Sequence, residues 1–234
     1  MSARNDMAGH KHNDRDEETG VYLKIKKDVV YNQFAPRSQL KLKELSDKYG
    51  FGDTPVRDAL IKLATEGLIE YIPYKGYFTK PMTVLRFTQH YDAALVLLKY
   101  AIQSGPSSFT TEEPCPSYLF GEPAPTGEAE TTPSHARDIE SLYGRIAAMS
   151  ENSEVMSLIG RFIDHTRYIR ELGLEQTEGR GTIVEGMICL VKLLAAGDRT
   201  AAIEILTVLF DQKIALLAES VKEGNNRALG AVRS

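Results

Sequence analysis

The spacing of apolar residues divides the chain into two folded regions between polar ends. Residues 1–19 are polar and show neither helical nor strand periodicity, so they are predicted to be a disordered tail. In residues 20–82 apolar positions first recur every four residues and then gather in short β-type runs. Helical spacing dominates residues 83–222, and residues 223–234 revert to a polar tail. The pattern predicts a mainly α protein, with a small mixed domain followed by an all-α helical bundle.

The first region contains three short helical patterns joined by tight connections. Gly50 follows the second pattern and Gly67 follows the third, and glycine commonly ends a helix. Only Phe51 and Gly52 lie between the second helix and the third. Asp53 stands where its carboxylate can accept a hydrogen bond from the first turn, which predicts an N-cap.

Two β-type runs follow the third helix, at Leu68–Ile72 and Tyr77–Thr79. Pro73–Gly76 joins them, and its proline and glycine favour a turn, so the pair is predicted to be a hairpin. Two helices joined by a tight turn and followed by a hairpin make a winged helix-turn-helix. That fold suits DNA, because its second helix fits the major groove. Winged helices also serve as protein-docking modules, which is the alternative.

The outward face of the third helix carries the first candidate chemistry. Core packing takes up the apolar side chains of this helix, which leaves Thr54, Pro55 and Arg57 on or beside the opposite face. Arg57 can donate two hydrogen bonds to a guanine or to a phosphate. Lys43 and Lys75 can neutralise phosphates from the second helix and from the hairpin. Ordinary solvated charges would give the same sequence pattern.

The distribution of charge agrees with this division only modestly. Residues 20–82 carry 11 Lys and Arg against 7 Asp and Glu, whereas residues 83–234 carry 14 against 20. The first region is therefore better suited to a polyanion. A solvated surface explains so small an excess equally well.

Five helices are expected in the second region, at 84–103, 138–149, 153–172, 181–195 and 199–222. The pattern at 181–195 is apolar on most faces, which predicts a central place in the bundle. Asp198 is a candidate cap for the last helix. Between the first two helices, residues 104–137 hold six of the ten prolines. That composition predicts an irregular connection, and a lid over a pocket is the alternative.

Composition places the chain among soluble globular proteins, with 42% hydrophobic and 26% charged residues. No apolar run is long enough to cross a bilayer, and the N-terminus lacks the apolar core of a secretory signal. Two cysteines are too few for a disulfide framework or a cysteine zinc site. No phosphate-binding glycine loop, serine elbow or His/Cys cluster indicates an enzyme. We expect a cytoplasmic protein that is not an enzyme and contacts no membrane.

One continuous stretch resembles a known family. The string KELSDKYGFGDTPVRDALIKLATEGLIEYIPYKGYF is similar to the DNA-binding domain of the GntR family of bacterial transcription regulators. The family has L-A/S on helix two, T-P-V-R-x-A-L at the start of helix three, L-x-x-E-G-L before the wing, and a glycine at the wing tip. The chain supplies these elements as Leu45-Ser46, Thr54–Leu60, Leu63, Glu66–Leu68 and Gly76. The resemblance implies a homodimer that binds double-stranded operator DNA, most commonly as a repressor.

Position by position, the resemblance assigns DNA contacts on the two helices and the wing to Lys43, Thr54, Arg57, Gly76 and the neighbouring Lys75. The family usually has Ser-Arg or Ser-Lys just before Thr-Pro, and the basic residue often reads a base. This chain has Gly52 and Asp53 there. An acidic side chain would repel phosphate and can only accept from cytosine. We therefore favour the capping role for Asp53.

The second region resembles, more weakly, the all-helical effector domain of the FadR-like branch. The phrases IAAMSEN, IRELGLE and LLAAGDRTAAIEIL match the text at its helix ends. That domain commonly holds a divalent metal through an Asp and three His. Aligned here, the four ligand places fall on Ile139, Tyr143, Met187 and Leu209. Apolar and phenolic side chains do not replace carboxylate and imidazole ligands, so we expect neither a metal nor another cofactor.

The same alignment predicts an apolar pocket wall with one phenol for a small-molecule effector. Tyr143 and Met187 are candidate contacts, through a hydrogen bond and hydrophobic packing. An organic acid is a candidate effector because basic side chains in this region can hold an anion, namely Arg145, Arg161, Arg167 and Arg170. For each arginine a surface ion pair is the commoner role. The alternative function is a winged-helix dimerisation or docking module without effector sensing.

Overall fold

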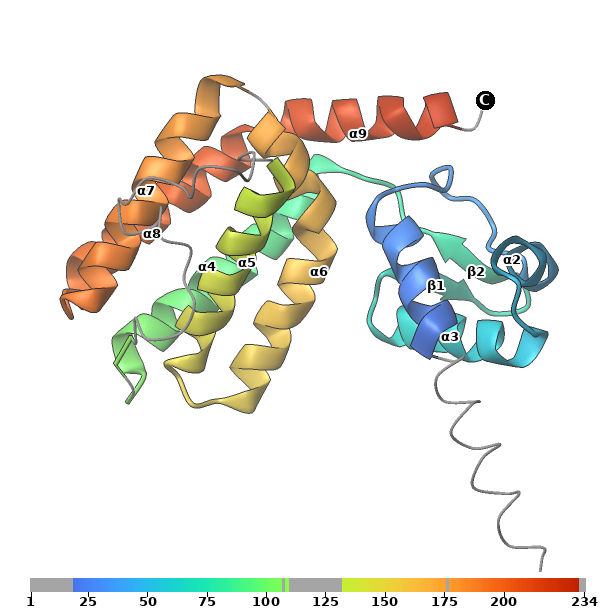
Figure 1. Cartoon of the computed structure of the whole chain (residues 1–234), viewed down its shortest axis with the longest axis horizontal. Coiled ribbons are helices and arrows are strands. Elements are labelled where there is room, and N and C mark those ends of the chain that lie inside the picture. Colours follow the sequence, from blue (N-terminus) through green and yellow to red (C-terminus); the bar gives the residue numbers. More distant parts are fainter. Residues whose placement is uncertain (1–18, 107, 110–131, 176, 232–234) are drawn as a thin grey trace, which may run out of the picture. The chain divides into compact units, whose positions relative to one another are not determined.

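The structure is a computed structural model that describes residues 19–106, 108–109, 132–175 and 177–231 (Figure 1). The chain divides into two compact units. One unit comprises the chain up to Met82 together with the residues from Asn225 onward, and the other comprises Thr83–Gly224. The predicted N-terminal tail lies outside the described residues, except for residue 19, which is helical. Among the described helices, none is long and apolar enough to cross a membrane.

The first unit is a winged helix-turn-helix, as the sequence predicts. Its first helix covers residues 19–30. The following elements are α2 (Leu42–Tyr49), α3 (Asp53–Thr65), β1 (Ile69–Ile72) and β2 (Gly76–Thr79). The two strands pair antiparallel, with Ile69 opposite Thr79 and Ile72 opposite Gly76.

Two glycines end the DNA-binding helices, as predicted. Gly50 has a left-handed φ of 73° and its N–H donates to the carbonyl of Ser46. Gly67 has a φ of 78°, and the N–H groups after α3 bond back to its last turn. A side chain at either position would be strained, because L-residues rarely adopt positive φ. The proline of Ala35-Pro36 predicts the end of the first helix there, but the helix already stops at residue 30.

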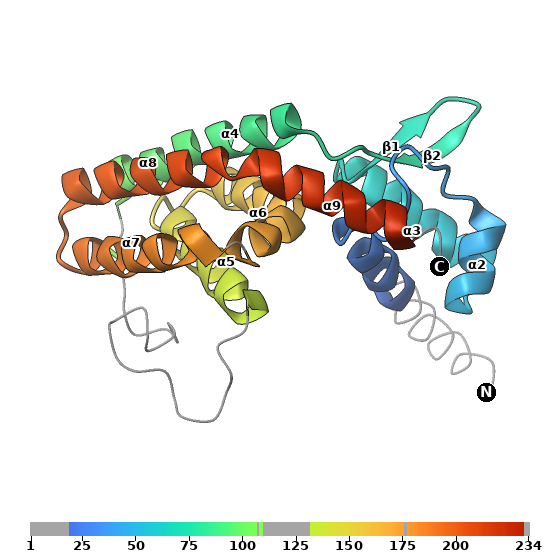
Figure 2. The same cartoon turned by 90° about the horizontal axis from the view of Figure 1, so that it is seen from above.

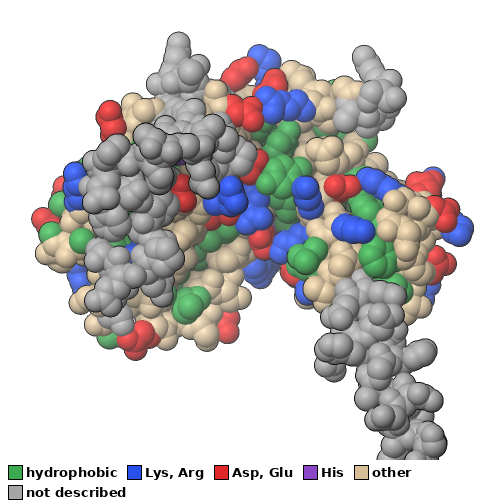
Figure 3. All heavy atoms as spheres, viewed as in Figure 1, with side chains coloured by type: hydrophobic (Ala, Val, Ile, Leu, Met, Phe, Trp, Pro, Cys, Tyr) green, Lys and Arg blue, Asp and Glu red, His purple; other side chains and the backbone are tan. Residues whose placement is uncertain are grey.

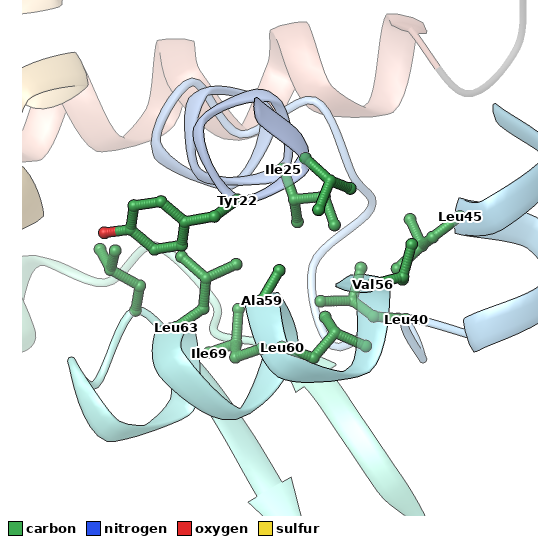
Figure 4. Packing of buried hydrophobic residues seen from close by; sticks show 11 residues of the cluster. Tyr22, Ile25, Leu40, Leu45, Val56, Ala59, Leu60, Leu63 and Ile69 are labelled. Atoms are coloured by element: carbon green, nitrogen blue, oxygen red, sulfur yellow. The ribbon is translucent and has the colours of Figure 1, made fainter. Parts of the chain in front are cut away.

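One apolar core joins the helices and the hairpin of this unit (Figure 4). Val21 and Ile25, from the predicted stripe of the first helix, are fully buried. They belong to the same cluster as Val56, Leu60 and Leu63 of α3. Each large aliphatic side chain contributes about 1.5–3 kcal/mol by leaving water. This packing fixes which face of α3 remains outside.

The second unit is all-helical. Its helices are α4 (Val84–Ser104), α5 (Thr132–Ala148), α6 (Ser153–Glu175), α7 (Thr177–Ala195), α8 (Arg199–Ala215) and the first part of α9 (Leu217–Ala231). Asp198 caps α8 as predicted, because its carboxylate accepts from the N–H of Ala201 at 3.0 Å. Helix α4 packs against α5, α6 and α8. Figure 2 shows α4 running alongside α8.

The predicted central place of the 181–195 helix is wrong. Helix α7 packs on α8 and α6, and its Cys189 and Lys192 are exposed. Gly186 explains the tight fit on α8, since a Cβ there would lie 2.6 Å from the Leu209 side chain. The apolar residues of α7 therefore serve a close contact with one neighbour rather than burial on all sides.

Two predicted boundaries in the second region are also wrong. Helix α5 begins at Thr132, so the last residues of the expected irregular segment 104–137 are helical, and the burial of His135 and Ala136 explains this. Residues 110–131 lie outside the described residues. The predicted 199–222 helix is interrupted at Leu216, and α9 runs on to Ala231 instead of leaving a polar tail at 223–234.

Candidate functional site

The outward face of α3 is the first candidate site. Val56, Ala59, Leu60 and Leu63 are buried and so orient the helix. Thr54 and Arg57 are exposed on the other side, as predicted, and Pro55 is half-buried. No described residue forms a salt bridge with Arg57. The guanidinium is therefore available for a bidentate contact with a base edge or a phosphate.

Asp53 does not cap α3, so that prediction is wrong. The N-cap position belongs to Gly52, and no side chain caps the helix. The carboxylate of Asp53 instead accepts a hydrogen bond of 2.7 Å from the hydroxyl of Ser46, which is buried on α2. This contact joins the two helices across the tight turn. Because the carboxylate is engaged with α2, Asp53 has a structural role in positioning α3.

Lys43 lies on the exposed surface of α2. Its ammonium is 3.1 Å from the Asp47 carboxylate, and its side chain is 79% exposed. The hydrogen bond to Asp47, and then the charges of Asp47 and Asp53, raise the pKa of Lys43. Exposed pairs of this kind contribute little to stability. Lys43 can therefore exchange Asp47 for a phosphate at small cost.

The hairpin forms a braced wing. Its turn is closed by the N–H of Lys75, which donates to the carbonyl of Ile72 at 3.0 Å. The Gln39 side chain donates to the carbonyl of Lys75 at 2.7 Å. Gly76 has a φ of 99°, which favours glycine, and Tyr74 at the tip is fully exposed. The wing thus presents the exposed Lys75 and Tyr74 from a fixed turn.

The wing also has an aromatic face, which the sequence-based predictions do not include. The rings of Tyr71 and Tyr77 lie 5.1 Å apart on opposite strands, and Tyr71 is 55% exposed. Burial and then Tyr71 raise the pKa of Tyr77, whereas the charge of Arg57 lowers it, so Arg57 lies near this ring. Cross-strand pairing of two tyrosines was the available signal, since the register places Tyr71 opposite Tyr77.

The charge of the first unit is mixed rather than concentrated. On the face seen in Figure 3, Lys and Arg side chains of this unit alternate with acidic and apolar ones. This agrees with the small basic excess of residues 20–82. Recognition on such a surface depends on a few placed side chains more than on a broad positive field.

Comparison with known proteins decides the class of this unit. The profile described as "Bacterial regulatory proteins, gntR family" matches residues 18–78. Residues 18–78 form a DNA-binding helix-turn-helix domain of the GntR family. A relative from Streptomyces ambofaciens, an "Uncharacterized HTH-type transcriptional regulator in unstable DNA locus", is 28% identical over 214 residues. That alignment covers 85% of this chain and 86% of the relative.

Two further comparisons concern the first part of the chain and the fold. The "HTH-type transcriptional repressor RspR" of Escherichia coli is 28% identical over 95 residues, or 41% of each chain. A "putative transcriptional regulator GntR from Rhodococcus sp. RHA1" superposes with a TM-score of 0.64 at 14% identity. It covers 87% of this chain and 98% of that chain, so the shared fold extends through the helical unit.

The helical unit contains a second candidate site, at the places where the resemblance puts metal ligands. Ile139, Tyr143, Met187 and Leu209 are all buried. Within the described ranges, no three His, Cys, Asp or Glu side chains gather as a metal site would require. The hydroxyl of Tyr143 accepts a hydrogen bond of 2.5 Å from the side-chain nitrogen of Lys213. Lys213 is not among the residues predicted from the sequence.

Two arginines share one buried carboxylate beside this phenol. Arg170 donates to Glu140 at 2.6 Å, and Arg167 donates to the same carboxylate through two nitrogens at 2.8 and 3.1 Å. Arg170 also donates to the hydroxyl of Thr166 and is 3% exposed. The ion pairs expected for Arg167 and Arg170 exist. The pair of Arg170 lies in the core, whereas the Arg167 side chain remains 35% exposed.

The remaining basic candidates lie elsewhere. Arg145 stacks on the ring of Phe109, with its guanidinium carbon 4.5 Å from the ring centre. Arg161 is exposed and lines a groove of about 160 Å³ between α4 and α6. His165 lies in the same groove, 3.3 Å from His90 of α4. The structure therefore brings Tyr143 and Arg170 together and leaves Arg145 and Arg161 in other surroundings.

Proposed function

We propose that the protein represses transcription as a homodimer on a two-fold operator, and that a small molecule bound in the helical unit modulates this binding. The free, exposed Arg57 on α3 of a GntR domain is the observation that carries the proposal. One recognition helix reaches one half-site only, so reading a full operator requires two copies. The repressor RspR among the relatives supports repression. The site of action would be the cytoplasm.

The residues of the first unit divide into two roles in this proposal. Arg57 and Thr54, with Pro55 shaping the first turn, meet base edges in the major groove. Lys43 and Lys75 bind phosphates on either side. Gly76 lets the wing tip approach the DNA closely, because it has no side chain.

Effector binding is proposed for the helical unit, through Tyr143, Met187, Arg145 and Arg167. Tyr143 has the strongest support, because its hydroxyl bonds to Lys213, which lines a small cavity. Arg167 is held by Glu140, so it would act by positioning that carboxylate. Met187 is buried and would contribute apolar contact.

Selection of bound fragments from genomic DNA tests the DNA-binding part. We expect enrichment of a short inverted repeat whose half-sites lie about one helical turn apart. Light scattering at micromolar concentration should give the mass of a dimer. A folded protein that enriches no sequence would contradict operator recognition and favour the docking module. A monomer, with and without the selected DNA, would contradict the dimer.

The effector part is tested on the selected operator. Candidate metabolites, organic acids included, are added to a titration of labelled operator with the protein. At least one compound is expected to change the operator affinity by about fivefold or more, which is the usual range of allosteric coupling. If no compound related to the genes beside the operator has an effect, effector modulation is wrong while DNA binding stands.

A further inference from the structure

Tyr74 at the tip of the wing has an unfavourable backbone conformation. The turn is closed by the hydrogen bond from the N–H of Lys75 to the carbonyl of Ile72, so Pro73 and Tyr74 are its two central residues. Tyr74 has a φ of 63°. A turn with proline at its first central place and a positive φ at its second is of type II, and the second place favours glycine or asparagine. A bulky side chain is strained there.

The rest of the wing keeps this turn from relaxing. The strand pairing places Ile72 opposite Gly76 and so fixes the two ends of the turn. The side chain of Gln39 holds the carbonyl of Lys75 from outside the hairpin. Because contacts on both sides define the backbone, the strain at Tyr74 persists in the folded protein.

The Tyr74 side chain makes no stabilising contact that would offset this strain. It is fully exposed, and among the described residues it forms no hydrogen bond or ring contact. The other described non-glycine residues with positive φ are Asn32, Arg37 and Glu151, whose side chains are polar. Within the described chain, only Tyr74 combines a left-handed backbone with a large ring in water, and both disfavour the folded state. This combination points to a partner outside the chain.

The location of Tyr74 indicates which partner this is. It directly precedes Lys75, to which the proposed function assigns a phosphate contact. When α3 lies in the major groove, a hairpin that follows it passes the phosphate backbone and meets the neighbouring minor groove. That groove is about 6 Å wide, so it admits the edge of one phenol ring but no helix.

The chemistry of a phenol suits one class of base pair in this groove. A·T and T·A pairs present only acceptors there, namely adenine N3 and thymine O2, whereas a G·C pair adds the amino group of guanine. A phenol hydroxyl can donate to such an acceptor. The guanine amino group would occupy the place that the hydroxyl needs.

We infer that Tyr74 enters the minor groove beside each half-site and donates from its hydroxyl to adenine N3 or thymine O2, so that it selects an A·T pair there. The inference rests on the DNA binding proposed above and adds a base-reading residue on the wing. The left-handed conformation directs the ring out of the unit, which explains why a strained tyrosine stands at this place.

Base substitution in the operator tests the minor-groove contact. In the operator that selection from genomic DNA yields, each A·T pair beside the half-sites is replaced by G·C and then by inosine·C. Inosine keeps the major-groove edge of guanine but lacks its amino group. We expect at least one position per half-site where G·C lowers the affinity about fivefold or more and inosine·C restores it. The absence of such a position, or inosine·C as weak as G·C, would overturn the inference.

Two variants assign the contact to Tyr74. Tyr74→Phe keeps the ring and the strained backbone but lacks the donor, whereas Tyr74→Gly removes the ring and the strain. In both, the affinity for the A·T operator should fall about fivefold or more, and the difference between A·T and G·C should disappear. A Tyr74→Phe protein that still distinguishes A·T from G·C would contradict donation by the hydroxyl.

Thermal melting separates a role in binding from support of the fold. Tyr74→Gly should raise the melting temperature, because glycine adopts a positive φ without strain, although the variant binds operator more weakly. A lower melting temperature would mean that the ring supports the wing and would overturn the inference. Asn32→Gly changes another residue of this unit with positive φ, of 54°, and is the matched control. It should leave the operator affinity unchanged, and an equal loss there would count against Tyr74.

The outcomes distinguish this inference from the proposed function. If wild type selects an operator that the Tyr74 variants bind equally tightly, operator recognition stands and the inference is wrong. If wild type selects no sequence at all, operator recognition is contradicted and the inference with it.

Discussion

The two units use charged side chains in opposite ways. In the first unit Lys43 and Arg57 project into water, and Lys43 is paired with an exposed carboxylate. In the second unit Glu140, Arg170 and Lys213 are buried. Arg170 donates a hydrogen bond to Glu140, and Lys213 donates one to Tyr143. Exposed charges can change partners at small cost, which suits contact with DNA. Buried charges cannot, so they are suited to distinguishing one small ligand from another.

The largest expected effect comes from breaking the buried set. Glu140→Gln removes the carboxylate that pairs with the buried Arg170 and with Arg167, and should lower the free energy of unfolding by about 3–5 kcal/mol. Unfolding in urea measures this loss of free energy. Glu219→Gln removes an exposed carboxylate paired with Lys222 and should cost less than about 1 kcal/mol. Similar losses of unfolding free energy in the two variants would contradict the proposed difference between buried and exposed charges.

Next comes the exposed arginine of α3. Arg57→Ala should weaken binding to the selected operator by about 1–3 kcal/mol while leaving the melting temperature unchanged. Fluorescence anisotropy with labelled operator measures the affinity. Lys27→Ala, at an exposed position of the first helix, is the control. A folded Arg57→Ala protein with undiminished affinity would show that α3 does not read the DNA as proposed.

The third prediction concerns pH. The pKa of Lys213 is depressed in the folded protein, so the unfolded chain binds the extra proton between that depressed pKa and the ordinary value of 10.5. In this window the wild type gains stability as pH rises, by at most about 1.4 kcal/mol per unit. Lys213→Met lacks the gain, so the stability of wild type relative to the variant should increase as the pH rises toward 10.5. Parallel pH curves for the two proteins would contradict a neutral, buried Lys213.

The smallest effect is expected at Lys43. Replacing it with alanine should weaken binding to all DNA sequences about equally, because a phosphate contact carries no base information. The dependence of the logarithm of affinity on the logarithm of salt concentration should become shallower by about one. Anisotropy titrations at several salt concentrations measure this slope. A loss confined to one operator sequence would instead assign Lys43 to base reading.

The sequence predicted the first unit well because its determinants are local. Glycines at 50 and 67 end helices through their own backbone conformation, and the stripe at Val21 and Ile25 needs only helical spacing. The role of Asp53 was predicted wrongly for the same reason. A capping prediction uses only the backbone N–H groups of the helix that Asp53 begins. In the structure the Asp53 carboxylate accepts instead from the hydroxyl of Ser46 on α2.

The polar core of the second unit could not be predicted by such local rules. Glu140, Arg170 and Lys213 are far apart along the chain, and each by itself resembles a surface residue. Lys213 offered one signal, because it lies three and four residues after the buried Phe210 and Leu209, on the apolar side of α8. A lysine at that position interrupts the amphipathic pattern. An interruption of this kind marks a candidate site in the sequence itself.

The Ser46–Asp53 hydrogen bond has a consequence for how much of the genome the regulator can distinguish. At this position the family resemblance places a basic side chain that often reads a base, whereas here the side chain fixes the angle between two helices. Giving up one specified base pair lets any of the four bases stand there, which enlarges the set of acceptable half-sites about fourfold. We therefore expect a degenerate binding motif and a larger number of chromosomal sites, with selectivity recovered through the spacing and symmetry of paired half-sites.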